Sequence, residues 1–144
     1  MTRALQIPVW MSLAVLVFLS TSGLAFAQQK PEEPALHSSD AWLALTDSGS
    51  YADAHQEAAE YFKAAVTKDH WESEMHAGRD PLGKVLSRKL KSAMYVKALP
   101  GMPDGDYVVI QYDSSFEHKQ SALETVTPML DKDGKWRVSG YYIK

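Results

Sequence analysis

The chain of 144 residues contains no cysteine. Thiolate catalysis, cysteine-ligated zinc, disulfides and a lipid anchor on cysteine are therefore not expected. Lysine and arginine are absent from residues 31–62, and acidic residues are absent between Asp80 and Asp104. Such charge runs are most often solvated faces, although they can also orient a charged partner. The net charge of −3 argues against nucleic acid as the partner.

Long hydrophobic runs are also scarce. One of them, residues 9–19, follows the cation Arg3 and precedes the small-residue triplet 25–27. This order predicts a cleavable signal peptide over residues 1–27, with cleavage between Ala27 and Gln28. An uncleaved membrane anchor is the less favoured alternative, because eleven residues are too few to span a hydrocarbon layer of about 30 Å. We therefore expect a periplasmic or secreted protein without stable membrane insertion.

The remaining sequence divides into a flexible tether and one domain. Residues 28–39 contain two prolines and no hydrophobic periodicity, which predicts the tether. Residues 40–144 form the domain, in which helical periodicity changes to strand alternation near Lys89. Three helices are expected over 40–47, 50–66 and 67–78, followed by strands over 89–97, 107–113, 121–130 and 135–143. The sequence predicts an α+β fold in which the N-terminal helices pack on a curved four-stranded antiparallel meander.

The turn of the last hairpin decides which residues face the helices. A type I turn from Asp131 with Gly134 as a left-handed bulge residue places the apolar residues on one face, whereas a two-residue turn mixes charged and apolar residues on both. We choose the bulged register because a one-sided sheet needs one apolar face. It pairs Glu124 with Tyr142 and points Glu124 toward the helices.

A carboxylate on the apolar face of a sheet is costly unless it is paired, so Glu124 is the most informative polar residue. One interpretation is a structural pair with Arg79 or Arg88, or a hydrogen bond from Tyr142. The other is a polar group at the bottom of a ligand pocket between helices and sheet. The candidate ligand-binding residues are Glu124, Arg79, Arg88, Trp71, Tyr112 and Tyr142.

The histidines do not predict a metal centre. His70 and His76 lie near two glutamates, but their spacing does not place all four on one face of a helix. His55 lies on the apolar stripe of its helix, which favours a buried, hydrogen-bonded histidine over a ligand. No metal, cofactor or catalytic residue is predicted, since nucleophile-elbow and phosphate-loop motifs are absent from the sequence.

Several motifs together resemble one family of exported bacterial proteins. They begin with Asp47-x-Gly49-x-Tyr51, Arg79-x-Pro81-Leu82-Gly83 and Ser87-Arg88, and continue with Leu99-Pro100-Gly101-x-Pro103, Glu124-x-Val126-Thr127 and Gly134-x-Trp136-x-Val138-x-Gly140-Tyr141. The chain is thereby identified as a member of the domain of unknown function 4019 family over about residues 40–144. The resemblance implies a cystatin-like or nuclear-transport-factor-2-like α+β layout. It implies no activity.

Two functional hypotheses follow. The first is a non-enzymatic periplasmic binding or protein-interaction module, whose ligand is a small molecule or an envelope protein. The second is a small lyase-like or isomerase-like enzyme that uses Glu124 as general base. A basic docking edge along the strand from Lys89 to Lys97 is a further structural interpretation.

Overall fold

The fold is known from a computed structural model, which describes residues 30–144. The predicted signal peptide and its cleavage site, Ala27 and Gln28, lie outside the described residues. Within the described part, no helix is both long enough and apolar enough to cross a membrane.

The first helix, α1 (Glu32–Asp47), begins eight residues earlier than expected. The predicted tether is therefore wrong for residues 32–39. Pro31 is the N-cap and Pro34 lies in the first turn, where the amide hydrogen that proline lacks has no partner within the helix. The buried stripe uses small and polar residues as well as large ones, which hid its periodicity; it consists of Ala35, Ser39, Trp42, Leu43 and Thr46.

The helix expected over residues 50–66 is interrupted. The structure has α2 (Tyr51–Gln56) and α3 (Glu60–Ala65), followed by α4 (Lys68–Gly78) and the short 3-10 helix η1 (Asp80–Leu82). Between α2 and α3, the amide of Ala59 donates to the carbonyl of Val138 at 2.8 Å. The helix ends here because the backbone pairs with a strand edge instead of with its own preceding turn.

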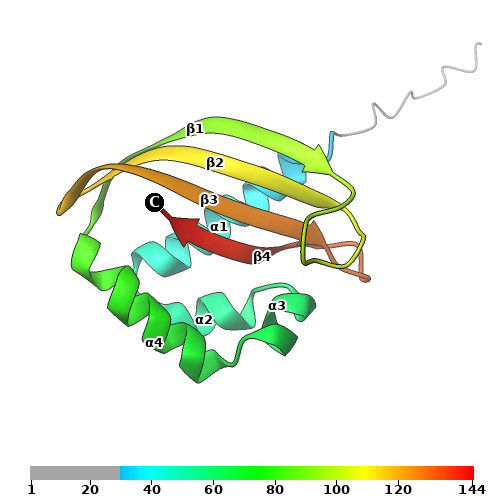
Figure 1. Ribbon diagram of the computed structural model, residues 1–144, viewed down its shortest axis with the longest axis horizontal. Helices are drawn as coiled ribbons and strands as arrows, with labels where there is room; N and C mark the ends of the chain where they lie inside the picture. The colour runs from blue at the N-terminus through cyan, green and yellow to red at the C-terminus, as the bar shows by residue number, and fades with distance from the viewer. Residues whose placement is uncertain (1–29) are drawn as a thin grey trace, which may run out of the picture.

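Four antiparallel strands follow in the order β1-β2-β3-β4. They are β1 (Val85–Val96), β2 (Tyr107–Phe116), β3 (Lys119–Leu130) and β4 (Trp136–Ile143). The sheet is curved and open, with α1 across one face and α2, α3 and α4 beyond β4 (Figure 1). The predicted α+β class and the meander are confirmed.

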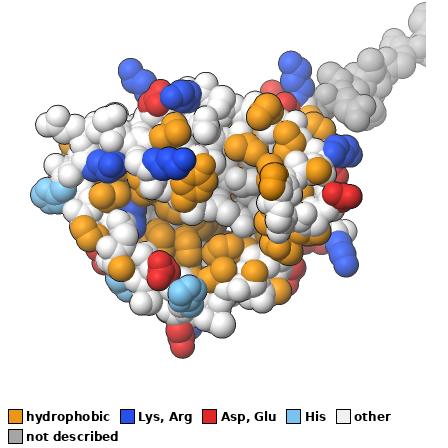
Figure 2. Space-filling view, in the orientation of Figure 1, with side chains coloured by type: hydrophobic (Ala, Val, Ile, Leu, Met, Phe, Trp, Pro, Cys, Tyr) orange, Lys and Arg blue, Asp and Glu red, His pale blue; other side chains and the backbone are white. Residues whose placement is uncertain are grey.

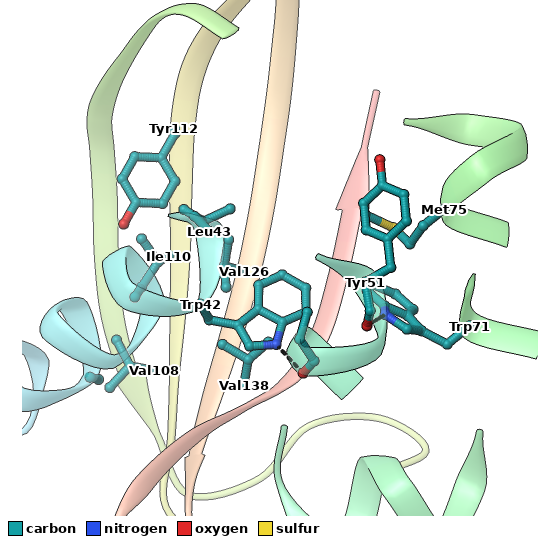
Figure 3. Packing of buried hydrophobic residues seen from close by; sticks show 12 residues of the cluster. Trp42, Leu43, Tyr51, Trp71, Met75, Val108, Ile110, Tyr112, Val126 and Val138 are labelled. Atoms are coloured by element: carbon teal, nitrogen blue, oxygen red, sulfur yellow. Dashed lines mark hydrogen bonds between the residues drawn. The ribbon is translucent and has the colours of Figure 1, made fainter. Parts of the chain in front are cut away.

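The core lies between α1 and the inner face of the sheet. Val108, Ile110 and Val126 project from the central strands toward Leu43 and are fully buried (Figure 3). On the helical side, the indole of Trp42 donates to the carbonyl of Ala54 at 2.8 Å, the contact drawn as a dashed line in Figure 3. This contact fixes α2 against α1, because a buried indole N–H needs an acceptor.

A bulge at Lys91 changes the faces of β1. Regular alternation along this strand would place Leu90 and Met94 on one face, but Leu90 lies opposite Tyr112 and Met94 lies opposite Val109. The two side chains are therefore on opposite faces, and both are exposed at this edge of the sheet.

A second bulge corrects the predicted register of β4. Gly134 adopts the left-handed conformation (φ 79°), and Leu130 pairs with Trp136 as predicted. Farther along, two residues of β4, Ser139 and Gly140, oppose Thr127 alone, so that every later pair shifts by one. Glu124 thus pairs with Ile143 rather than with Tyr142.

Candidate functional site

The carboxylate of Glu124 is fully buried and surrounded by donors. Arg88 donates from Nε to Oε1 at 2.7 Å and from a terminal nitrogen to Oε2 at 3.1 Å. The Ser114 hydroxyl donates to Oε1, and the Tyr141 hydroxyl donates to Oε2 at 2.7 Å. Both carboxylate oxygens are therefore occupied by neighbouring side chains.

The network extends from Glu124 to the helices through Asp47, at the end of α1. Asp47 accepts two hydrogen bonds from Arg88, at 2.7 and 3.0 Å, and one from Arg79 at 3.2 Å. Arg79 also donates to the carbonyl of Gly83, and its guanidinium lies 4.5 Å from the ring centroid of Phe116. We call Asp47, Arg79, Arg88, Ser114, Glu124 and Tyr141 the polar network.

The charged groups of the polar network are paired with one another. Burial lowers the pKa of Arg88, but the hydrogen bonds that Arg88 donates to Asp47 and Glu124, together with their negative charges, outweigh burial, so the pKa is raised overall. Burial, the charge of Glu124 and the hydrogen bond to it raise the pKa of Tyr141. Two arginines balance two carboxylates, and the contacts join the ends of α1 and α4 to all four strands. The arrangement holds charges in place and leaves no lone pair of Glu124 directed at a substrate.

The structure does not bring the six predicted ligand-binding residues together at one site. Glu124 and Arg88 belong to the polar network, joined to Arg79 through Asp47. Tyr112 is buried directly opposite Glu124 on β2, but its hydroxyl donates to Asp40 at 3.2 Å instead of to Glu124. Burial raises the pKa of Tyr112, and the nearby charge of Asp40 raises it further.

Tyr142 does not contact Glu124, contrary to the expected hydrogen bond. The bulge turns its side chain to the outer face, where it is 49% exposed. The neighbouring Tyr141 takes the inner position and packs its ring 5.3 Å from that of Trp42. Trp71 packs edge-on against Phe62, with ring centroids 5.3 Å apart.

An open cleft lies between α4 and β4, next to the polar network. Its volume is about 320 Å³, and it brings together Trp71, Arg79 and Tyr142 of the predicted residues. Hydrophobic side chains are visible in the hollow between the sheet and the helices (Figure 2). The other lining residues are Glu74, Met75, Gly78, Tyr141 and Ile143. We call this the α4/β4 cleft.

The edge of β4 is covered along its first half and uncovered along its second. Ser38 of α1 donates to the carbonyl of Trp136 at 2.8 Å, and Ala59 donates to that of Val138. Leu123 and Lys144 exchange two hydrogen bonds, so by antiparallel alternation the amides and carbonyls of Tyr141 and Ile143 point away from β3. None of the hydrogen bonds found among residues 30–144 outside the sheet ladder uses them.

Three network residues were not identified from the sequence: Asp47, Ser114 and Tyr141. The register chosen from the last turn placed Tyr142 rather than Tyr141 on the inner face, because it did not include the bulge at Gly140. Gly140 could have predicted the bulge that brings Tyr141 inward, because glycine within a strand often marks a bulge. Asp47 appeared within the family motif, but its role depended on Arg88, which lies 41 residues away.

Residues 38–141 match the family model described as Protein of unknown function (DUF4019). The chain belongs to this family. No curated protein matches the sequence at a significant level. Four of the motif residues that indicated DUF4019 lie together in the polar network: Asp47, Arg79, Arg88 and Glu124. The cystatin-like layout stays a prediction.

The histidines have structural contacts. His55 is buried, and its Nε2 lies 2.6 Å from the carbonyl oxygen of Val66, so this nitrogen donates. His76 lies 2.7 Å from Asp80, which also accepts from the Tyr51 hydroxyl. These two hydrogen bonds, from Tyr51 and then from His76, lower the pKa of Asp80. The described residues contain no group of three or more potential ligands that could hold a metal ion.

Proposed function

We propose that this DUF4019 domain is a non-enzymatic interaction module that binds an extended peptide segment of a protein partner in the α4/β4 cleft. The observation that carries the proposal is the uncovered edge of β4 at Tyr141 and Ile143, which coincides with this cleft. Exposed strand edges bind extended peptides by adding a strand, and pockets beside the edge select side chains.

The walls of the cleft suit an apolar side chain of such a peptide. Trp71 and Met75 are buried residues whose surfaces form part of the lining, and Ile143 lies opposite on the strand. A volume of about 320 Å³ is at the lower end of ligand pockets and accommodates one or two side chains.

Arg79 offers a polar contact in the same place. It is only 4% exposed, and its Nε has no hydrogen-bond partner among the described residues. A buried donor without a partner costs free energy, so an incoming acceptor gains by meeting it. A peptide carbonyl or carboxylate can supply that acceptor. The side chain is held in position by its bonds to Asp47 and Gly83.

The alternative, an enzyme with Glu124 as general base, has less support. A general base must lie within hydrogen-bond reach of the proton that it removes. Glu124 is fully buried and hydrogen-bonded to Arg88, Ser114 and Tyr141, and it does not line the α4/β4 cleft. We further propose, from the predicted signal peptide, that the module acts in the periplasm or is secreted.

The proposal is tested by panning a phage-displayed library of random linear decapeptides on the immobilised full chain. The affinities of the selected peptides are then measured for two variants. Gly78→Leu fills the cleft, since a Cβ at Gly78 meets no atom within 4 Å. Ile143→Pro removes an outward amide hydrogen without breaking a ladder bond, because proline is tolerated where the amide faces away from the sheet.

Each variant has a matched control. Ala77→Leu places the same leucine side chain at an exposed position of α4 outside the cleft, and Ile143→Val keeps the amide. We expect affinities to fall by roughly tenfold in both test variants, the equivalent of one or two hydrogen bonds, and to stay unchanged in both controls. Failure to enrich any peptide, or equal binding by all four variants, would overturn the proposal.

A further inference from the structure

A second groove lies on the outer face of the sheet, away from the polar network. The loop of residues 97–106, between β1 and β2, hangs over the sheet beside β3 and β4 (Figure 1). The groove between this loop and the sheet has a volume of about 460 Å³. The loop lines it with Leu99, Pro100 and Met102, and the sheet lines it with Thr125, Thr127 and Gly140. We call it the outer groove.

The loop that forms the upper wall is held in place. Gly105 donates its amide to the carbonyl of Lys97 at 3.0 Å, and the ammonium of Lys97 lies 2.8 Å from Asp106. The Tyr107 hydroxyl, beneath the loop, donates to the carbonyl of Pro103. The outer groove is therefore a formed feature, bounded by a braced loop and a rigid sheet.

One polar group on the groove floor lacks a partner. Thr125 is 3% exposed, and its hydroxyl oxygen makes no hydrogen bond within residues 30–144. The nearby Ser139 hydroxyl is satisfied, because it donates to the carbonyl of Thr127 at 2.7 Å. A buried hydroxyl without a partner is unfavourable in an apolar setting and is normally paired. The walls are mainly apolar, so a matching ligand has one polar group and an apolar body.

We propose that the outer groove binds a small apolar molecule that carries a single hydroxyl or carbonyl group, which meets the hydroxyl of Thr125. A peptide is a poorer match here, because this floor is the face of the sheet and presents no unpaired backbone edge. The volume suits a molecule of about ten to fifteen heavy atoms. The site is separate from the strand-addition site, although Tyr141 and Tyr142 line both.

The test uses 1-naphthol and naphthalene as probes, titrated into the full chain and followed by calorimetry. The two probes differ by one hydroxyl. We expect 1-naphthol to bind roughly fivefold more tightly, as one net hydrogen bond allows. In Thr125→Val, which keeps the side-chain shape, the preference should disappear. Thr127→Val removes a hydroxyl from the same groove and should keep it.

Gly140→Val tests the location. A Cβ at Gly140 meets only Thr127 Cβ, at 3.9 Å, so the substitution enters the groove without a close contact at Cβ. It should weaken both probes at least tenfold, whereas Gly78→Leu in the α4/β4 cleft should not affect them. Equal affinity of the two probes for the parent chain, or an unchanged preference in Thr125→Val, would overturn the inference. Neither outcome bears on the peptide proposal.

Discussion

The polar network and the α4/β4 cleft lie side by side and share Arg79 and Tyr141, yet they differ in how their polar groups are satisfied. In the polar network, each oxygen of Glu124 has two hydrogen-bond contacts from Arg88, Ser114 and Tyr141. In the cleft, the Nε of Arg79 and the edge of β4 at Tyr141 and Ile143 have none in the described part of the chain. The buried charges are therefore held by structural contacts, and the unmet hydrogen-bonding capacity of the cleft is what supports the proposed peptide site.

The largest effect expected from this comparison is on Glu124→Gln. An amide cannot balance Arg88 within the buried network, so the free energy of unfolding should fall by about 3 kcal/mol or more. Urea denaturation followed by circular dichroism measures it. Glu57→Gln, at an exposed position, should change stability by less than about 0.5 kcal/mol. Unchanged stability in Glu124→Gln would remove the distinction between network and site.

Tyr141→Phe should have an intermediate effect. It removes a hydrogen bond to a buried carboxylate, which contributes about 2 kcal/mol. Because the pKa of Tyr141 is raised by burial and by Glu124, the folded state keeps its proton where the unfolded chain loses it. The contribution is complete below about pH 10, the unfolded value, and is lost as the pH rises above it.

The pH dependence is measured from urea midpoints between pH 8 and pH 11. The midpoint of the parent chain should fall across this range, and that of Tyr141→Phe should fall less steeply. Tyr51 and Tyr112, whose pKa values are also raised by burial, maintain part of the slope. Parallel curves for the parent chain and the variant would contradict the assignment.

The smallest expected effects are the stability changes on replacing two glycines, Gly78 and Gly49, by alanine. Gly78→Ala places a methyl group in open space at the end of α4 and should stabilise the chain by up to about 1 kcal/mol. Gly49→Ala, two residues after Asp47, should destabilise it by about 1 kcal/mol, because φ there is +75°. Thermal unfolding of both variants measures this difference. If both substitutions destabilised the chain, the backbone at Gly78 beside the cleft would be as constrained as the backbone at Gly49 beside the polar network.

The sequence alone predicted several features because local patterns determine them. Alternation of apolar residues gave the strands of the meander, and the turn from Asp131 to Gly134 gave the start of the last hairpin with its left-handed glycine. Together these placed Glu124 on the inner face, where the structure has it.

Other features were decided only by the tertiary structure. Helix α1 extends over residues 32–39 because Ala35 and Ser39 find a sheet to pack on, and the helix breaks at Ala59 because Val138 accepts its amide. The bulge at Gly140 selects Tyr141 rather than Tyr142 as the partner of Glu124. Each depends on groups many residues apart along the chain, and no local periodicity records which of them will meet.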